Sequence, residues 1–310
     1  MGKAQIRLGL VGVGKIASDS HIPAIAGNYR FELVGTASHK GGVEGVPAYA
    51  EFDSLISAGL GLDAIVLCTP PSVRAALAHR ALAAGLHVFL EKPPAVALSQ
   101  VERLRAAAAQ AGRSLFTSWH SRESAAVDAA AAWLAQREIL GVRVNWREDV
   151  RQWHPGQDWL LAPGGFGVFD PAINALSILT RILPGALVLE HAELQIPANR
   201  ASPMRADVVL SHDGSSIVHC DLDILHEGRQ QWDIEVETDG GLLVLSAGGH
   251  ELTVAGKALP PAPNREYPRL YERFAQLVDT GQSEVDIMPL MLVADAMMLG
   301  VVRSIAPFEF

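Results

Sequence analysis

Short apolar runs alternate with helical patterns over residues 1–120 of the chain. The apolar runs predict strands at residues 6–11, 33–37, 64–68, 88–90 and 114–117. Ser72 is expected to open a helix that stops at Gly85, and Ser99 stands at capping-box spacing from Glu102 before an alanine-rich helix that stops at Gly112. Strands that alternate with helices indicate a doubly wound parallel sheet of the Rossmann type, covered by helices on both faces.

The pattern of apolar and polar residues changes after a helix predicted at residues 125–136. Long alternating stretches follow at residues 142–146, 188–196, 206–211, 217–224 and 232–238, which favours antiparallel strands because no crossover helices separate most of them. Glycine turns at residues 239–241 and 248–249 predict hairpins, and two helices are expected at residues 268–279 and 289–304. The sequence thus predicts an α/β protein with a Rossmann domain over residues 1–121 and an α+β domain over residues 122–310 with a large, mostly antiparallel sheet.

Composition and charge narrow the class of protein. The 310 residues carry 25 Lys+Arg against 34 Asp+Glu, a formal net charge of −9, which argues against a protein that binds nucleic acid through its phosphates. Cys68 and Cys220 form no C-x-x-C pattern, so neither a disulfide framework nor a metal site is expected. The apolar stretch 290–302 is short and contains Asp295, and residues 8–13 do not read as a signal peptide. We expect a cytoplasmic protein without a membrane partner.

A glycine-rich turn follows the first predicted strand. Gly12, Gly14 and Ala17, with Lys15 and Ile16 between them, form a G-x-G-x-x-A pattern between a strand and a helix. In Rossmann domains the first glycine allows the tight turn, the second lets the backbone approach a pyrophosphate, and the small third residue allows close helix packing. The pattern predicts a dinucleotide site at Gly12, Gly14, Lys15 and Ile16, and the alternative is a glycine turn without a ligand.

The end of the second predicted strand bears on which dinucleotide binds. Enzymes that use NAD usually place an acidic residue here for the ribose 2′-hydroxyl, whereas this chain has Ser38, His39 and Lys40. A hydroxyl and cationic groups suit a 2′-phosphate, which favours NADP over NAD. Use of both cofactors stays open, as does the interpretation of Lys40 as a solvated loop charge.

Three strand ends carry polar and proline-rich residues at the edge where parallel sheets bind ligands. Thr69 and Pro70 end one strand, Glu91 and Lys92 end the next, and His120 follows the last. A lysine held beside an acid and a proline is suited to work on a hydroxyl or carbonyl group, although a salt-bridged loop is the alternative. We expect Thr69, Pro70, Glu91 and Lys92 to lie along the cofactor.

A second candidate site lies in the glycine-rich run 164–174. Asp170 precedes Pro171, so this residue is either a helix N-cap or a functional carboxylate. Asn174 lies one helical turn further on, where it faces the same cleft or the surface.

Together, the glycine turn, Glu91-Lys92-Pro93 and the run into Asp170 resemble the Gfo/Idh/MocA oxidoreductase family over essentially the whole chain. The resemblance implies a Rossmann domain joined to an α+β domain whose open sheet often forms the oligomer interface, and hence a homodimer. The hallmark lysine of the family matches Lys92 and its aspartate matches Asp170. Asn174 stands where the family usually has a histidine, so proton transfer would depend on Asp170, Lys92 or water.

Residues 147–159 and Asn174 resemble the aldose 1-dehydrogenase branch of that family, which acts on L-arabinose and D-galactose. In this branch a glutamate and a histidine of the segment contact the sugar, and they match Glu148 and His154. The alternative is that Glu148 pairs with Arg147 or Arg151 and that His154 only begins a loop.

The resemblance implies NAD(P)-dependent oxidation of the C1 hydroxyl of L-arabinose, D-galactose or D-fucose to the lactone. Lys92, Asp170 and Asn174 would be catalytic, while Glu148, His154 and His120 would bind the sugar. Two alternatives stay open: a regulator that senses nucleotide and sugar without turnover, as in a fungal galactose-gene repressor of the family, and another sugar oxidoreductase.

Overall fold

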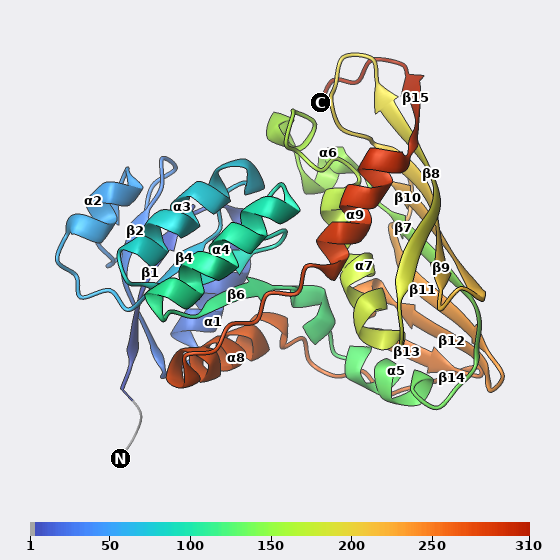
Figure 1. The fold of residues 1–310 in the computed structure, drawn as a ribbon, viewed down its shortest axis with the longest axis horizontal. Helices are drawn as coiled ribbons and strands as arrows, with labels where there is room; N and C mark the ends of the chain where they lie inside the picture. Colours follow the sequence, from blue (N-terminus) through green and yellow to red (C-terminus); the bar gives the residue numbers. More distant parts are fainter. Residues whose placement is uncertain (1–3) are drawn as a thin grey trace. The chain divides into compact units, whose positions relative to one another are not determined.

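The computed structural model describes residues 4–310 (Figure 1). The chain divides into two compact units. The first unit contains the residues up to His120 together with Tyr267–Ile287, and the second contains Ser121–Glu266 and Met288–Phe310. The sequence pattern placed residues 267–287 in the second domain, so the return of this segment to the first unit differs from the expected division.

The first unit is built on a parallel sheet, which confirms the predicted Rossmann architecture. Within residues 4–310 this sheet has six strands in the order β3-β2-β1-β4-β5-β6, and all neighbours pair in parallel. The strands are β1 (Ile6–Val11), β2 (Phe31–Ala37), β3 (Ala48–Tyr49), β4 (Ala64–Leu67), β5 (His87–Glu91) and β6 (Leu115–Ser118). β3 was not predicted, because two residues are too short a run to show a period.

Helices connect and cover these strands (Figure 1). A turn of π-helix, η1 (Ala17–His21), leads into α1 (Ile22–Ala26). The other helices of the unit are α2 (Phe52–Ser57), α3 (Pro71–Ala83), α4 (Leu98–Ala111) and α8 (Glu266–Thr280), of which Glu266 itself belongs to the second unit.

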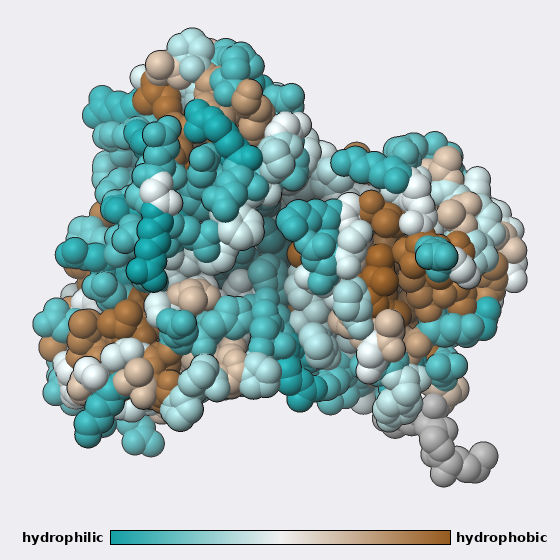
Figure 2. All heavy atoms as spheres, turned by 180° about the vertical axis from the view of Figure 1, so that it is seen from behind, coloured by the Kyte–Doolittle hydropathy of each residue, from teal (hydrophilic) through white to brown (hydrophobic). Residues whose placement is uncertain are grey.

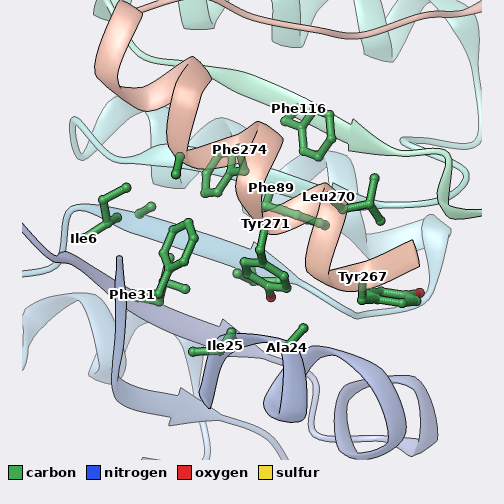
Figure 3. Close-up of a cluster of buried hydrophobic side chains, with 14 of the residues drawn as sticks. Ile6, Ala24, Ile25, Phe31, Phe89, Phe116, Tyr267, Leu270, Tyr271 and Phe274 are labelled. Carbon is green, nitrogen blue, oxygen red and sulfur yellow. The ribbon is translucent and has the colours of Figure 1, made fainter. Parts of the chain in front are cut away.

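The aromatic core of the first unit explains why α8 returns to it (Figure 3). Tyr271 and Phe274 of α8 are fully buried among side chains of the sheet. The ring of Tyr271 stacks on Phe89 with centroids 5.1 Å apart, and Phe274 stacks on Phe116 at 6.1 Å. Burial of aromatic rings stabilises this packing, but a periodic pattern predicts only that a helix forms and not which sheet it packs against.

The second unit is built on a larger sheet. Within the described residues it has nine strands in the order β14-β13-β12-β11-β7-β10-β9-β8-β15. The strands are β7 (Ile139–Arg147), β8 (Leu187–Pro197), β9 (Arg205–His212), β10 (Ser216–Asp223), β11 (Gln231–Thr238), β12 (Gly241–Ser246), β13 (Glu251–Val254), β14 (Lys257–Ala258) and β15 (Val301–Ile305). The pairs β10–β7 and β15–β8 are parallel and the others are antiparallel, so the predicted, mostly antiparallel sheet is confirmed.

Helices of the second unit pack against one face of this sheet (Figure 1). They are α5 (Val127–Leu134), α6 (Val150–Trp153), α7 (Phe169–Ile182) and α9 (Met288–Leu299), with short 3₁₀ turns η2 (His120–Glu123), η3 (Asp158–Leu160) and η4 (Ala247–Gly249). Along β7, Val142, Val144 and Trp146 are buried and Arg143 is exposed, as alternation along a strand requires. Among the helices within residues 4–310, none has both the length and the apolar character required to cross a bilayer.

The last predicted helix is wrong in its last five residues. We expected helix over residues 289–304, but α9 ends at Leu299 and the chain continues as β15, which pairs with β8. Gly300 marks the change, since a Cβ atom there would lie 2.4 Å from the carbonyl oxygen of Ala296 and 3.0 Å from Leu194.

Two predicted helix starts are also wrong. Pro70 is the N-cap of α3, so Ser72 lies within the helix. Ala97 is the N-cap of α4, so Ser99 and Glu102 do not form a capping box. The predicted stops are confirmed, because Gly85 and Gly112 adopt the positive φ values of 77° and 60° that favour glycine.

Candidate functional site

The two glycines of the turn after β1 differ in what surrounds them. Gly12 has a φ of 90°, and a Cβ atom there would lie 3.0 Å from the main chain of Cys68 and 3.1 Å from the Thr69 nitrogen. At Gly14, by contrast, a Cβ atom would have no described atom within 4 Å. The fold therefore requires Gly12, whereas the missing side chain at Gly14 leaves open space that fits the close approach of a ligand.

Thr69, at the end of β4, also suits a polar ligand beside this turn. Its hydroxyl oxygen is buried and has no hydrogen-bond partner among the described residues. Buried polar atoms normally have such a partner, so an orphaned hydroxyl next to Gly12 fits a group that the protein binds. Pro70, Lys15 and Ile16 are exposed, and the ammonium of Lys15 pairs with Asp19.

Ser38, His39 and Lys40 follow directly after β2. The Ser38 hydroxyl accepts a hydrogen bond from the Lys40 main-chain nitrogen at 3.1 Å, and the side chains of His39 and Lys40 are exposed. His39 Nδ1 lies 4.0 Å from a carboxylate oxygen of Glu51. The loop offers the cationic groups that a 2′-phosphate needs, with one acidic residue close by.

Lys92 lies at the end of β5 with its main chain held on both sides. Its N–H group donates to Oε2 of Glu91 at 3.0 Å. The guanidinium of Arg74, which is buried in α3, donates to the carbonyl oxygen of Glu91 at 2.7 Å and also to the carbonyl oxygens of Pro93 and Thr69. One arginine thus ties together the ends of β4 and β5.

The Glu91 carboxylate points into the unit rather than to its surface. Oε1 accepts hydrogen bonds from His21 at 3.0 Å, from Ser118 at 3.0 Å and from Tyr267 at 2.9 Å. Burial raises the pKa of Glu91, but the hydrogen bond from His21 and the charges of His21, His120 and Arg74 outweigh burial and hold this pKa well below its ordinary value of 4.5. Glu91 is therefore an ionised carboxylate whose hydrogen bonds are made inside the first unit, and its place along the cofactor stays a prediction.

The sequence analysis missed His21 and Tyr267, the partners of this carboxylate. His21 is fully buried, and its Nδ1 lies 2.8 Å from the hydroxyl of Tyr271. His120, a predicted sugar contact, stacks its ring on that of Tyr267 with centroids 5.6 Å apart. The sequence around His21 gives no signal of this role, because its partners Glu91 and Tyr271 lie 70 and 250 residues away.

Asp170 lies at the second position of α7. The N-cap of α7 is Val168, so the interpretation of Asp170 as the N-cap is wrong. The carboxylate is buried, and Oδ2 lies 3.8 Å from Nε2 of His154. The structure thus brings together two of the predicted site residues from α7 and from the loop after α6. Asn174 follows one helical turn along α7 and is half-buried.

Glu148 directly follows β7 and is buried. Its Oε2 accepts a hydrogen bond from the indole N–H of Trp232 at 2.9 Å, a partner that the sequence analysis missed. Trp232 packs between Trp146 and Trp153, with ring centroids 6.0 Å and 5.3 Å away. Arg147 pairs with Asp221, and Arg151 lies 3.6 Å from Asp149, so both arginines of the alternative interpretation have other carboxylate partners.

A glycine turn after β1 of a parallel sheet, with open space at Gly14 and a lysine after β5, two strands along the same sheet, fits a dinucleotide-dependent oxidoreductase. Residues 6–118 match the family described as "Oxidoreductase family, NAD-binding Rossmann fold". The chain belongs to this Gfo/Idh/MocA oxidoreductase family.

Full-length relatives agree with this assignment. The chain is 42% identical over 315 aligned positions to galactose 1-dehydrogenase of Pseudomonas fluorescens, covering 98% of each chain. It is 48% identical to D-galactose-1-dehydrogenase of Rhizobium etli, whose crystal structure matches with a TM-score of 0.95 over 100% of this chain and 99% of that one. A 3-ketoreductase of Actinomadura kijaniata shares the fold, with 19% identity and a TM-score of 0.84 over 97% of this chain and 99% of that one.

Proposed function

We propose that this oxidoreductase is an NAD(P)-dependent aldose 1-dehydrogenase, with D-galactose, L-arabinose and D-fucose as substrates. The observation that carries the proposal is the similarity to galactose 1-dehydrogenase, at 42% identity over 98% of the chain. A bound dinucleotide would accept the hydride from C1 of the pyranose at its nicotinamide ring, while the C1 hydroxyl loses its proton and the sugar becomes the lactone.

The residues of the chain supply the proton chemistry of this reaction. Asp170 is the base for the C1 hydroxyl, and its buried carboxylate beside His154 is held in place for that role. Lys92 donates a hydrogen bond to the C1 oxygen and stabilises the negative charge that develops there. Since Asn174 replaces the usual histidine of the family, it orients the sugar without accepting a proton.

Glu148, His154 and His120 bind the ring hydroxyls of the sugar. The hydrogen bond from Trp232 fixes Oε2 of Glu148, which presents the carboxylate in one orientation. The three sugars share the arrangement of the C2 to C4 hydroxyls and differ at C5. A site that binds the C2 to C4 hydroxyls would accept all three sugars. A methyl or hydroxymethyl difference at C5 changes kcat/KM by only ~10 to 200-fold.

A spectrophotometric screen tests the activity. The chain is mixed with NAD or NADP and a dozen aldoses, and reduced cofactor is followed by its absorbance. Turnover that is fastest on the three named sugars is expected. Binding of sugar and cofactor without turnover would favour the regulator, and turnover on other sugars alone would favour a different oxidoreductase.

The loop after β2 supports a preference for NADP over NAD, because Ser38, His39 and Lys40 provide no carboxylate to repel a 2′-phosphate. Ser38→Asp places a negative charge at this point. We expect the ratio of kcat/KM for NADP to that for NAD to fall at least ~tenfold, or about 1.4 kcal/mol. A wild-type protein with no measurable turnover with NADP would contradict the proposed preference for NADP.

The outer face of the large sheet supports a homodimer. Val188, Ile217 and Leu242 lie in one row across β8, β10 and β12, on the same face as Gly141, and all three are exposed. Figure 2 shows hydrophobic residues gathered at one end of this unit (lower left). A second copy placing the same row against this one would bury both, because a two-fold interface is self-complementary. Light scattering should give the mass of a dimer, and Ile217→Lys should shift it toward the monomer.

A further inference from the structure

The main chain of Lys92 is held by buried side chains that the proposed function leaves without a role. Oε2 of Glu91 accepts from the Lys92 N–H at 3.0 Å. The guanidinium of Arg74 donates hydrogen bonds to the carbonyl oxygens of Glu91 and Pro93, the residues before and after Lys92. The peptide that carries the lysine is therefore restrained at its nitrogen and on both flanks.

The other oxygen of Glu91 is fixed by donors from three separate parts of the first unit. His21 comes from the turn of helix after the glycines, Ser118 from the end of β6 and Tyr267 from α8. His21 is fully buried and Glu91 is 3% exposed. An ionised carboxylate without partners is costly in such surroundings, so these donors determine which way the carboxylate turns.

We propose that Glu91 is a positioning residue that holds the main chain of Lys92 in the conformation the reaction requires, and that His21 fixes the orientation of the Glu91 carboxylate. The proposal rests on the proposed function, because it takes Lys92 as the group that works on the C1 oxygen. Oε1 is occupied by three donors, so Oε2 faces the Lys92 N–H and holds the start of the lysine side chain in one place. Catalytic groups must be held within about 0.5 Å of their working geometry, and a shared carboxylate provides such a restraint.

Glu91→Gln separates this role from ordinary packing. The amide has nearly the same shape, but one of its two polar atoms is an N–H donor. Three donors on the Oε1 side keep the amide oxygen there, so the amide nitrogen faces the Lys92 N–H and displaces it. We expect kcat for the aldose to fall by ~10 to 100-fold, the range caused by displacing a catalytic group by about 1 Å or less. The KM for the sugar and the Kd for the cofactor should change much less than kcat.

Ser118→Ala is the matched control. It also removes a buried hydrogen bond to Glu91, but from Oε1, where His21 and Tyr267 still donate. Both variants should lower the melting temperature, whereas only Glu91→Gln should lower kcat strongly. His21→Gln provides a second test if Glu91→Gln fails to fold. His21→Gln and Ser118→Ala each leave two other donors on Oε1, but the hydrogen bond and charge of His21 are the foremost causes of the lowered Glu91 pKa, whereas Ser118 is a neutral donor. Loss of His21 should therefore loosen the carboxylate more than loss of Ser118, and kcat should again fall while KM stays nearly constant.

A measurement that does not depend on turnover completes the experiment. Hydrogen exchange at the Lys92 amide, followed by NMR or mass spectrometry, should be slow in the wild type and in Ser118→Ala and much faster in Glu91→Gln or His21→Gln. Equal exchange rates, or a kcat for the folded Glu91→Gln within about twofold of that for Ser118→Ala, would overturn the positioning role. A wild type that exchanges as expected but oxidises no aldose would instead contradict the proposed function.

Discussion

Gly12 and Gly14 differ at the scale of one residue in how far the fold explains them. Gly12 is explained by its own backbone, since φ is 90° and the main chain of Cys68 lies 3.0 Å from a Cβ placed there. No such reason applies to Gly14, where a Cβ would stand clear of every described atom. The proposed dinucleotide supplies a reason for the second glycine that the packing of the fold does not.

Gly14→Val should therefore weaken cofactor binding and leave the fold intact. The new side chain occupies the space into which the pyrophosphate would come, and we expect a Kd at least ~tenfold higher, or about 1.4 kcal/mol. Fluorescence titration measures the Kd and thermal melting measures the fold. Gly12→Ala is the contrasting variant, because it should lower the melting temperature directly. An unchanged Kd in a folded Gly14→Val protein would argue against a dinucleotide at this turn.

Asp170 offers a second decisive substitution at the scale of one residue. Because Val168 is the N-cap of α7, the carboxylate of Asp170 is not needed to begin the helix. Asp170→Asn should keep the side-chain shape and remove the proton acceptor, so kcat should fall by ~100 to 10,000-fold. Steady-state kinetics at several pH values, with cofactor binding as the check on folding, measure this loss. Near-normal turnover would transfer proton acceptance to Lys92 or to water.

At the scale of elements, the sequence predicts those helix ends and strands whose positions depend on neighbouring residues in the chain. Gly85 and Gly112, with positive φ, mark the ends of α3 and α4. Strands of the first sheet such as β4 and β5 are short, continuously apolar runs, whereas β7 and β10 of the second sheet alternate buried and less buried positions. The helix starts were less predictable. Serine is a good N-cap, but Pro71 favours the first position of α3 strongly enough to start the helix before Ser72.

The residues of the candidate site also divide into those that the sequence reveals and those that only the tertiary structure reveals. Motif residues such as Lys92 and Asp170 carry a signal because their neighbours in sequence are unusual. His21 and Trp232 carry none, since their roles arise only when distant elements pack: His21 meets Glu91 across 70 positions, and Trp232 meets Glu148 across 84. Pairwise contacts of this kind require the tertiary structure.

Gly300 tests why α9 ends where it does. A methyl group at this position would contact the Ala296 carbonyl oxygen at 2.4 Å and Leu194 at 3.0 Å, and the former is a main-chain atom that moves only with the helix. Gly300→Ala should destabilise the protein by ~1 to 3 kcal/mol, the usual cost of overpacking. Thermal melting should record a lower midpoint, while kcat measured well below that midpoint stays near the wild-type value. Gly141→Ala is a suitable control, because a Cβ there meets no described atom within 4 Å.

At the scale of the whole molecule, the stability of the fold should depend on pH through two histidines with opposite effects. His250 in the second unit lies 3.1 Å from the buried Glu266, and the hydrogen bond that His250 donates to Glu266 raises the pKa of His250 above its ordinary 6.5. Glu266 also accepts from the hydroxyl of Ser124. In the first unit, burial lowers the pKa of His87, with a further contribution from the charge of Arg113.

These two pKa shifts act in opposite directions on the free energy of unfolding. A raised pKa means that the folded state binds the proton more tightly, so the His250 contribution is fully present below pH 6.5 and is lost as the pH rises through the folded pKa. A lowered pKa means that the folded state resists protonation, so the His87 contribution is present above pH 6.5 and is lost as the pH falls. The wild-type pH profile is the sum of both and does not reveal either one alone.

His250→Gln isolates the first contribution. Glutamine keeps a donor near Glu266 but cannot become charged, whereas His87 titrates identically in both proteins and cancels in the difference. The melting temperature of the wild type should exceed that of His250→Gln most at about pH 6, and the gap should shrink as the pH rises to about 8.5. Melting both proteins across this range, at constant ionic strength, measures the gap. A gap that stays constant with pH would show that His250 contributes by packing alone, and a gap that widens would reverse the sign assigned to its pKa shift.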